Sequence, residues 1–341
     1  MCEYDLEDGH KCPLQRYGNS PFCILHLDFP ENKKSIEYSQ VIELKNNAIR
    51  EKIQTGDYNF YGVIIHEFTF PEESIINTSI NFNKTKIEGD VSLGREVTIQ
   101  GHAFFKGSKI KGNAWFGGSS FKGDIRFDGA QIGGDALFSG ISTKGDIWFN
   151  DAIINGYALF LGALIEGNAS FERATIEGDA CFDGATIKGD ACFDGATIKG
   201  DARFCHDKVA GGIIQGDISL IDTKILRKLK FSNSFFNKQH AKEQINRLAK
   251  RLCEARGEKF DADKYFFREM VARRKQKSRL ETYGKYSKIG RFIKWCEFWL
   301  EWPLEYLFFY GVYPAFTFLI WIFIIVIFAV IYGLFSMVDV S

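Results

Sequence analysis

The sequence predicts a mainly β protein: a four-sided parallel β-helix with helical caps, followed by one C-terminal transmembrane helix. Three observations support this fold class. Residues 181–191 recur without change at 192–202, large apolar residues return every five or six positions from about 65 to 236, and residues 315–338 carry no charge. The 341 residues have a formal net charge of +0. The chain as a whole therefore has no field that would attract nucleic acid.

The repeat over residues 59–236 indicates very short strands joined by bends. Steps that alternate between five and six fit neither a 3.6-residue helix nor a long two-residue strand, and Gly or a polar turn residue soon follows most of the apolar positions. Small and large residues at i−2 and i face inward together, as in Ala180 with Phe182. Twenty-two residues then form one coil, with Phe and Ile on successive sides and Thr143 in one apolar slot. About eight coils stack about 4.8 Å apart; a three-sided hexapeptide helix is the alternative.

Glycine and aspartate recur at the expected corners. Glycines such as Gly129 and Gly200 are expected to give the corners their unusual dihedral angles. The aspartate that follows many of them, as at Asp135, is expected to bond backbone groups of its own turn.

The alternation of Ala-x-Phe-x-Gly with Ala-x-Ile-x-Gly resembles the pentapeptide-repeat family, which implies a right-handed quadrilateral β-helix. This sequence departs from the family pattern in its six-residue units and in the Thr, Cys, Leu or Ser that often precedes the central Phe or Ile. Some members of the family imitate DNA with an acidic rod. Residues 59–236 hold 22 acidic and 18 basic residues, so neither DNA mimicry nor a nucleic-acid partner is expected.

Residues 1–30 contain a candidate metal site, Cys2, Cys12, Cys23 and His26, in the spacing C-x9-C-x10-C-x2-H. Three thiolates and one imidazole suit a closed tetrahedral site, which predicts a zinc-knuckle-like motif with one structural zinc per chain. Unrelated surface thiols are the alternative, and His10 could replace a ligand. The spacing resembles the zinc motif of plant growth-regulating factors, although the residues around it are acidic here. No signal peptide is recognisable, so a reducing compartment is expected.

Helical patterns flank the repeats. Residues 39–57 predict an amphipathic capping helix with Val41, Leu44, Ala48, Ile49 and Ile53 on its apolar face and Lys45 among its polar residues. Residues 237–280 predict an αα-hairpin. Its first helix would bury Ala241, Ile245, Leu248, Leu252 and Ala255, Gly257 would end that helix, and Asp261 would be the N-cap of the second.

The C-terminal part predicts attachment to a lipid bilayer. Residues 281–313 form a basic and aromatic interfacial segment, and residues 314–338 form a transmembrane helix. Residues 264–294 hold eleven Lys or Arg against two acids, which predicts a single pass through the cell membrane with the N-terminus cytoplasmic. The run Tyr-Phe-Phe-Arg-Glu-Met-Val-Ala-Arg-Arg at 265–274 also resembles membrane-linked prokaryotic pentapeptide-repeat proteins.

The sequence shows no arrangement typical of catalysis. Its six histidines form no nucleophile–base pattern, and no phosphate-binding or metalloprotease motif is present. We therefore expect a non-catalytic, membrane-anchored scaffold or protein-interaction module with an unidentified protein partner on the solenoid surface. The alternative is an oligomeric membrane effector or ion-channel-like subunit with a cytosolic sensing rod, which would require a homo-oligomer.

Overall fold

The computed structural model describes residues 1–277 except 7–8, 95, 206–212 and 233–235. The chain divides into two compact units, Met1–Asn237 and Lys238–Ser341. The first unit contains the N-terminal segment, one helix and the solenoid, and the second contains two further helices. Each unit is described by itself.

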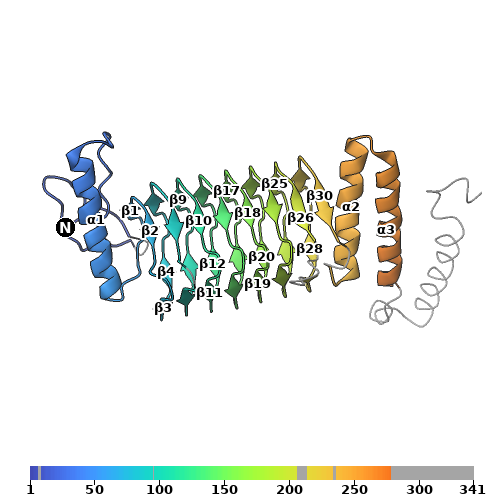
Figure 1. The fold of residues 1–341 in the computed structure, drawn as a ribbon, viewed down its shortest axis with the longest axis horizontal. Coiled ribbons are helices and arrows are strands. Elements are labelled where there is room, and N and C mark those ends of the chain that lie inside the picture. Colours follow the sequence, from blue (N-terminus) through green and yellow to red (C-terminus); the bar gives the residue numbers. More distant parts are fainter. Residues whose placement is uncertain (7–8, 95, 206–212, 233–235, 278–341) are drawn as a thin grey trace, which may run out of the picture. The chain divides into compact units, whose positions relative to one another are not determined.

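The solenoid is built from four parallel sheets of very short strands (Figure 1). The first sheet contains β1 (Ile64–Ile65), β5 (Lys86–Ile87), β9 (Lys109–Ile110), β13 (Gln131–Ile132), β17 (Ile153–Ile154), β21 (Thr175–Ile176), β25 (Thr197–Ile198) and β29 (Lys224–Ile225). The second contains β2 (Phe68–Thr69), β6 (Val91–Ser92), β10 (Ala114–Trp115), β14 (Ala136–Leu137), β18 (Ala158–Leu159), β22 (Ala180–Cys181), β26 (Ala202–Phe204) and β30 (Leu229–Phe231).

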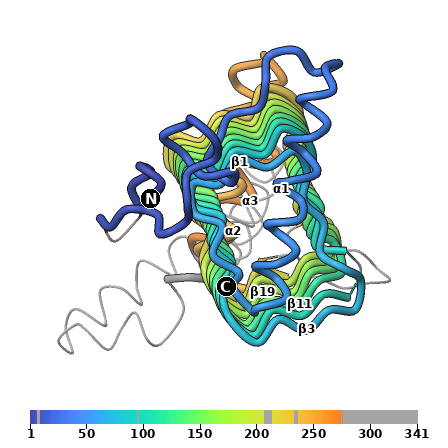
Figure 2. The backbone as a smooth tube through the Cα atoms, turned by 90° about the vertical axis from the view of Figure 1, so that its left-hand side faces the viewer, coloured from blue at the N-terminus to red at the C-terminus, as the bar shows by residue number. Residues whose placement is uncertain are grey.

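The other two sheets complete the square cross-section that is visible along the solenoid axis (Figure 2). The third contains β3 (Ile75–Ile76), β7 (Thr98–Ile99), β11 (Ser120–Phe121), β15 (Ser142–Thr143), β19 (Leu164–Ile165), β23 (Thr186–Ile187) and β27 (Ile213–Ile214). The fourth contains β4 (Ile80–Asn81), β8 (Ala103–Phe104), β12 (Ile125–Arg126), β16 (Ile147–Trp148), β20 (Ala169–Ser170), β24 (Ala191–Cys192) and β28 (Ile218–Ser219). The predicted mainly β, four-sided parallel architecture is confirmed.

The register between coils is 22 residues through the middle of the solenoid. Ala136 pairs with Ala158, for example. Near the start the step is 23, as between Val91 and Ala114, and near the end it is 27, as between Thr186 and Ile213. Because the extra residues fall between strands, the inward pattern continues unchanged on both sides of them.

The interior contains two opposed ladders of phenylalanine rings. Within each ladder the ring centroids of successive coils lie 4.6–5.3 Å apart, and the rings are nearly parallel. Rings of opposite ladders meet edge to face, as Phe149 and Phe160 do at 88°. The residues of one ladder come directly after strands of the fourth sheet: Phe105, Phe127, Phe149, Phe171 and Phe193. Those of the other ladder come directly after strands of the second sheet or are the last residue of such a strand: Phe116, Phe138, Phe160, Phe182 and Phe204. The predicted alternation of Phe and Ile sides is confirmed.

Small and branched residues fill the remaining interior. The first sheet contributes an isoleucine in each of its eight strands, and those from Ile65 to Ile225 are at most 4% exposed. Thr143 occupies one apolar slot of the third sheet with no exposed surface. Its Oγ1 donates to the carbonyl oxygen of Gly123 at 2.9 Å, which satisfies its buried hydroxyl.

The corner aspartates connect neighbouring coils. Oδ1 of Asp135 accepts a hydrogen bond from the backbone N–H of Tyr157 at 2.8 Å, and Asp124 and Asp179 make the same bond to Asp146 and Asp201. The expected bonds within the residue's own turn are therefore wrong for these residues. A position 22 residues away in sequence is the next coil in space, so its N–H group is the nearer donor.

The glycines serve two different needs. Gly129 has φ +64°, in the left-handed region that glycine adopts without strain. Gly200 has no positive φ, but an added Cβ would lie 2.4 Å from the carbonyl oxygen of Gly178 in the preceding coil. The expectation of unusual dihedrals holds at Gly129, whereas Gly200 is required by close approach.

Helix α1 (Ile36–Gln54) lies across the first coil (Figure 2). It begins three residues earlier than predicted because the Oγ of Ser35 caps the N–H of Tyr38 at 3.1 Å. Its buried face also differs from the prediction: Leu44 is 41% exposed, and Lys45 is completely buried. Lys45 takes this position because its ammonium finds buried backbone acceptors.

The second unit contains α2 (Gln239–Ala255) and α3 (Lys259–Lys277), which pack against each other. Gly257, at φ +74°, follows the end of α2 as predicted. Asp261 lies within the first turn of α3 rather than at its N-cap, and Ala255 is exposed. Arg247 and Arg273 lie within 3.2 Å of the buried carboxylates of Glu243 and Glu269, so ion pairs join the two helices.

In the part of the chain that the structure describes, no helix has both the length and the apolarity to cross a membrane. The predicted interfacial segment 281–313 and the predicted transmembrane helix 314–338 lie outside the described residues.

Candidate metal centre

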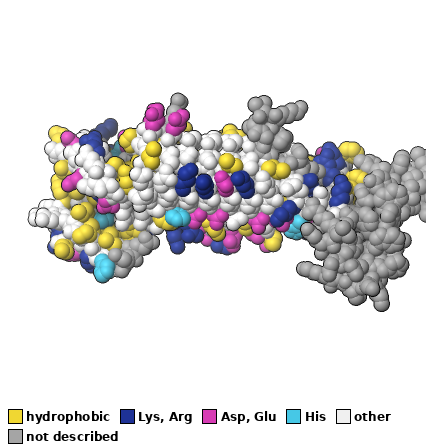
Figure 3. Space-filling model, turned by 90° about the horizontal axis from the view of Figure 1, so that it is seen from below, with side chains coloured by type: hydrophobic (Ala, Val, Ile, Leu, Met, Phe, Trp, Pro, Cys, Tyr) yellow, Lys and Arg dark blue, Asp and Glu magenta, His cyan; other side chains and the backbone are white. Residues whose placement is uncertain are grey.

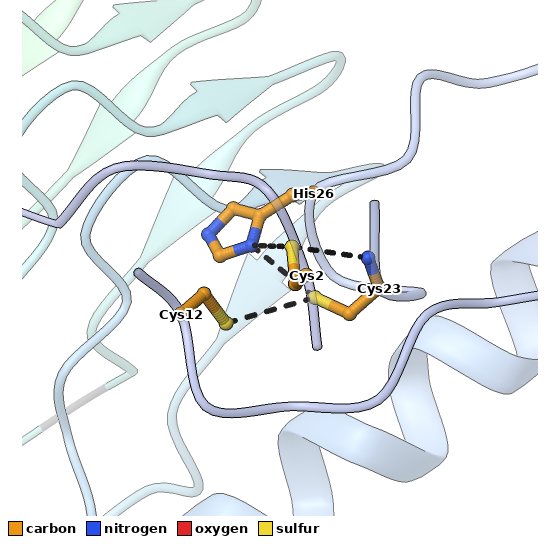
Figure 4. A group of neighbouring side chains, drawn as sticks. All are labelled: Cys2, Cys12, Cys23 and His26. Carbon is orange, nitrogen blue, oxygen red and sulfur yellow. Dashed lines mark hydrogen bonds between the residues drawn. The ribbon is translucent and has the colours of Figure 1, made fainter. Parts of the chain in front are cut away.

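The N-terminal segment brings the four predicted ligands together at one point (Figure 4). Their potential ligand atoms all lie within 4.8 Å of one another, and the side chains are at most 5% exposed. Nδ1 of His26 is 3.2 Å from Sγ of Cys23 and 3.6 Å from Sγ of Cys2, and the sulfur atoms of Cys12 and Cys23 are 4.0 Å apart. The four residues thus form a closed, buried cluster.

These separations fit a tetrahedral metal site. With metal–sulfur bonds of about 2.3 Å and metal–nitrogen bonds of about 2.0 Å, tetrahedral angles place two sulfurs about 3.8 Å apart and sulfur and nitrogen about 3.5 Å apart. The distances from Cys12 to Cys23 and from Cys2 to His26 lie close to these values. Three thiols and one imidazole are a donor set that zinc prefers, so the residues present can hold this ion.

Burial controls the protonation of the cluster. It raises the pKa of the Cys23 thiol to about 12 and lowers the pKa of His26 to about 4. Burial also acts to raise the pKa of Cys2, but hydrogen bonds from the backbone of Tyr4 and Cys23 and from the thiols of Cys23 and Cys12 together outweigh it, so the pKa falls. At neutral pH the imidazole is therefore uncharged and can bind a metal, whereas Cys23 needs a cation to stabilise its thiolate.

The other side of the imidazole fixes its orientation. Nε2 of His26 lies 3.3 Å from the carbonyl oxygen of Tyr61 in the first coil, which can only accept a hydrogen bond, so the proton resides on Nε2. Nδ1 is thereby left to face the sulfur atoms. The ring of Tyr4 stacks on that of His26 with centroids 4.0 Å apart and planes 4° apart. Tyr4 and Tyr61 therefore support the site, and the ligand spacing gave no signal for either.

Lys45 holds the segment that carries His26 in place. Its Nζ donates to the carbonyl oxygens of Leu25 at 3.2 Å, Leu27 at 2.7 Å and Ile64 at 2.9 Å. One ammonium thus joins the N-terminal segment, α1 and the first coil. The helical pattern of residues 39–57, which places Lys45 on the polar face, does not predict this role. The available signal was its position four residues from both Val41 and Ile49, which lie on the buried face.

The remaining candidates lie apart from the cluster. His10, the alternative ligand, is exposed and is not among the clustered residues. Cys181 lies in β22 of the second sheet and Cys192 in β24 of the fourth, so these two thiols occupy different faces of the solenoid. The structure therefore brings together the four predicted ligands and leaves the repeat cysteines separate.

Comparison with known proteins identifies the repeats. The family described as pentapeptide repeats (9 copies) matches residues 82–131 and 127–175, which lie within the four-sheet solenoid. No curated protein and no solved structure matches the chain significantly. Residues 82–175 are thus similar to this family, and they contain the same inward ladders and 22-residue register as the coils around them.

Proposed function

We propose that this protein is a membrane-anchored, non-catalytic interaction module that presents a pentapeptide-repeat solenoid to a protein partner. The inward positions of the coils are filled by side chains such as Phe149 and Ile154, which have no exposed surface. Partners can therefore reach only the outward faces of the sheets. A solenoid that presents long regular faces is typical of proteins that act through binding.

The observation that favours an interaction role most is a row of apolar side chains on the outward face of the second sheet. Trp115 pairs in register with Leu137, and Leu137 with Leu159, so the three side chains are neighbours along the solenoid. Trp115 is 47% exposed, and Tyr157 and Leu161, beside Leu159 in sequence, are 48% and 40% exposed. Contiguous apolar surface of this kind is typical of sites of protein contact.

The charges on the solenoid do not favour nucleic acid. Ion pairs between coils join Glu88 to Lys111 at 2.6 Å and Glu177 to Lys199 at 2.8 Å. Side chains of both signs lie along the face shown in Figure 3. This mixture differs from the single-sign surface that binding or imitating a phosphate backbone requires, which supports a protein partner.

The membrane anchor is proposed from the sequence. The uncharged run of residues 315–338 would span about 36 Å as a helix, enough for a hydrocarbon core of about 30 Å, and the basic residues before it favour a cytoplasmic N-terminus. The Cys2, Cys12, Cys23 and His26 cluster would hold one structural zinc, which its complete burial supports.

Carbonate extraction tests the anchor. The full chain is expected in the membrane pellet after an alkaline wash. A variant with Ile324→Lys and Ile327→Lys should appear in the supernatant, because two charges in the apolar run oppose insertion. The matched control, Lys285→Gln and Lys288→Gln, changes two residues outside that run and should stay in the pellet. Recovery of the unaltered chain in the wash would overturn the membrane proposal.

Photocrosslinking tests the interaction role. A benzophenone amino acid placed at Leu159, in the apolar row, should form a discrete crosslinked product with another polypeptide in the producing cells. The same residue placed at Gln131, an exposed position of the first sheet, serves as the control and should give none. The same products from both positions, or from neither, would contradict a partner on the second sheet.

A further inference from the structure

A groove of about 680 Å³ runs along the fourth sheet and the corner that follows it. Its lining comes from five consecutive coils. The first of these residues is Asn81, the last residue of β4, and the last is Arg173, three residues after the end of β20. With about 4.8 Å between coils, these residues extend over about 19 Å parallel to the solenoid axis. A long, narrow shape of this kind suits a linear ligand.

The groove is open because one of its corner residues has no side chain. Gly129 lines the groove at φ +64°, and an added Cβ there would meet nothing within 4 Å. Asp151 and Arg173 occupy the equivalent corner of the next two coils in the same left-handed conformation, at φ 56° and 55°. Their side chains close one end of the groove, where Arg173 donates to Asp151 at 2.7 and 2.9 Å.

Spare hydrogen-bond donors line the rest of the groove. Oδ1 of Asn83 accepts from the backbone N–H of Lys106 at 2.7 Å, which directs the Nδ2 group away from the backbone. Asn83 is only 8% exposed, and its Nδ2 has no hydrogen-bond partner among residues 1–277 that the structure describes. Asn81 and Asn150 are arranged alike: each Oδ1 accepts a backbone N–H, and each Nδ2 is left over.

The charged groups of the groove also leave donors available, because its carboxylates form ion pairs with described residues and its ammonium group does not. Asp151 is occupied by Arg173, and Asp128 lies 3.3 Å from Nε of Arg126. Lys106 is exposed and forms no ion pair within 4.0 Å in the described part of the chain. Burial raises the pKa of the Asp128 carboxyl, and the positive charges of Arg126 and Lys106 partly oppose this rise. The two carboxylates of the groove are thus ion-paired within it, whereas three amide groups and one ammonium have hydrogen atoms to donate.

The geometry points to this groove as the binding site for an extended acidic peptide segment of about six residues. Such a segment spans about 20 Å, and its carboxylates and backbone carbonyls supply the acceptors that the groove lacks. Phe104, which lines the groove, offers contact for an apolar side chain. This inference rests on the proposed role as an interaction module and specifies the chemistry of one partner.

Fluorescence anisotropy with the full-length protein in detergent tests the assignment. The probe is a fluorescein-labelled, amidated hexapeptide of alternating Glu and Leu, and the matched probe has Gln for each Glu. We expect saturable binding of the first peptide and at least about tenfold weaker binding of the second, because charge-assisted hydrogen bonds are the stronger ones. Equal affinity for both peptides, or no saturable binding, would overturn the inference.

Variants locate the site. Lys106→Gln should weaken binding about fivefold, and Asn83→Asp, which exchanges an NH2 group for a carboxylate oxygen of the same size, about tenfold or more. Lys122→Gln is the matched control, since Lys122 is exposed but does not line the groove. An equal loss of peptide affinity in Lys122→Gln would show that the attraction is diffuse and electrostatic, and it would overturn the assignment of the groove as the binding site. Melting curves of each variant check folding, and the exposed Lys106 position gives an answer even if Asn83→Asp does not fold.

Two further results separate this inference from the proposed function. If a sulfated hexasaccharide displaces the peptide and binds more tightly, the groove is a carbohydrate site and the peptide assignment fails. If the groove variants leave the Leu159 crosslinks unchanged and no acidic peptide binds, the groove inference fails while the interaction module stands.

Discussion

The Nε2 atom of His26 lies 3.3 Å from the carbonyl oxygen of Tyr61, which joins the candidate metal centre directly to the first coil of the solenoid. The same end of the solenoid is joined to α1 by the three carbonyl contacts of Lys45. The geometry of the candidate ligands and the packing of the solenoid end are therefore physically linked, because a shift of the His26 ring would break its bond to the coil.

Metal analysis of the purified protein should find about one zinc per chain. Replacing Cys23 and His26 by Ala should remove it, because two ligands cannot hold a structural zinc, and should lower the melting temperature of the N-terminal end. Cys192→Ala, which removes a thiol from the fourth sheet, is the control and should retain the metal. Full zinc content in the double variant would place the ion elsewhere.

Lys45→Met should destabilise the N-terminal end by about 3–5 kcal/mol, because it leaves three carbonyl oxygens without their donor. Lys52→Met is the comparison. Lys52 forms an ion pair with Asp57 at the surface, and its loss should cost less than about 1 kcal/mol. Urea unfolding followed by circular dichroism measures both, and equal effects would contradict the structural role of the Lys45 contacts.

Phe149→Ala should cost about 3–5 kcal/mol, since Phe149 stacks between Phe127 and Phe171 and leaves a cavity when it is truncated. Phe104→Ala, at an outward position two coils earlier, should cost about 1 kcal/mol or less because that residue is partly exposed. The urea midpoints of the two variants give the comparison. Similar midpoints would mean that the interior ladder does not dominate stability.

Ser108→Ala and Ser119→Ala should each raise stability by about 1 kcal/mol. Both residues are completely buried, and their hydroxyls have no hydrogen-bond partner among the residues that the structure describes. Removing them therefore removes the cost of burying an unsatisfied polar group. Thr143→Val should instead lower stability by about 1–2 kcal/mol, because that hydroxyl donates to Gly123 and accepts from the N–H of Gly145. Thermal melting of the three variants should show opposite signs for the serines and the threonine.

Cys181 should react slowly with iodoacetamide at pH 8. Burial raises the pKa of its thiol to about 11, so little thiolate is present until the pH approaches that value. Because the folded thiol holds its proton above the usual value of 9.0, its contribution to the free energy of unfolding should fall as the pH rises from about 9 to 11. Mass spectrometry of the labelled peptide gives the rate, and equally fast labelling in native and urea-unfolded protein would contradict this burial.

The inward pattern was predictable because it depends only on spacing. Steps of five and six residues define which positions face inward, and the narrow interior accepts few side chains other than apolar ones. The inward position of Thr143 could therefore be assigned from spacing alone. The corner bonds were not predictable in the same way. Asp135 and its donor partner, the backbone N–H of Tyr157, are 22 residues apart, and they come together only after the coils stack.

The candidate metal centre shows the same difference between local patterns and contacts that exist only after folding. The four ligands follow from residue type and spacing, but the preference for His26 over His10 depends on the position of the Tyr61 carbonyl, which belongs to the solenoid. The burial of Lys45 depends on carbonyls from two other segments. A local pattern therefore fails to predict burial for a residue whose hydrogen-bond acceptors come from segments distant in the sequence.

The 22-residue register has a consequence for changes in chain length. Insertion of eleven residues would preserve the interior, because a phenylalanine side would again follow an isoleucine side. It would also turn every later coil by half a revolution and so exchange the outward surfaces of the second and fourth sheets. The identical units 181–191 and 192–202 already show this, because they place Cys181 in the second sheet and Cys192 in the fourth. Only the insertion of a complete 22-residue coil lengthens this solenoid while each outward surface keeps its direction.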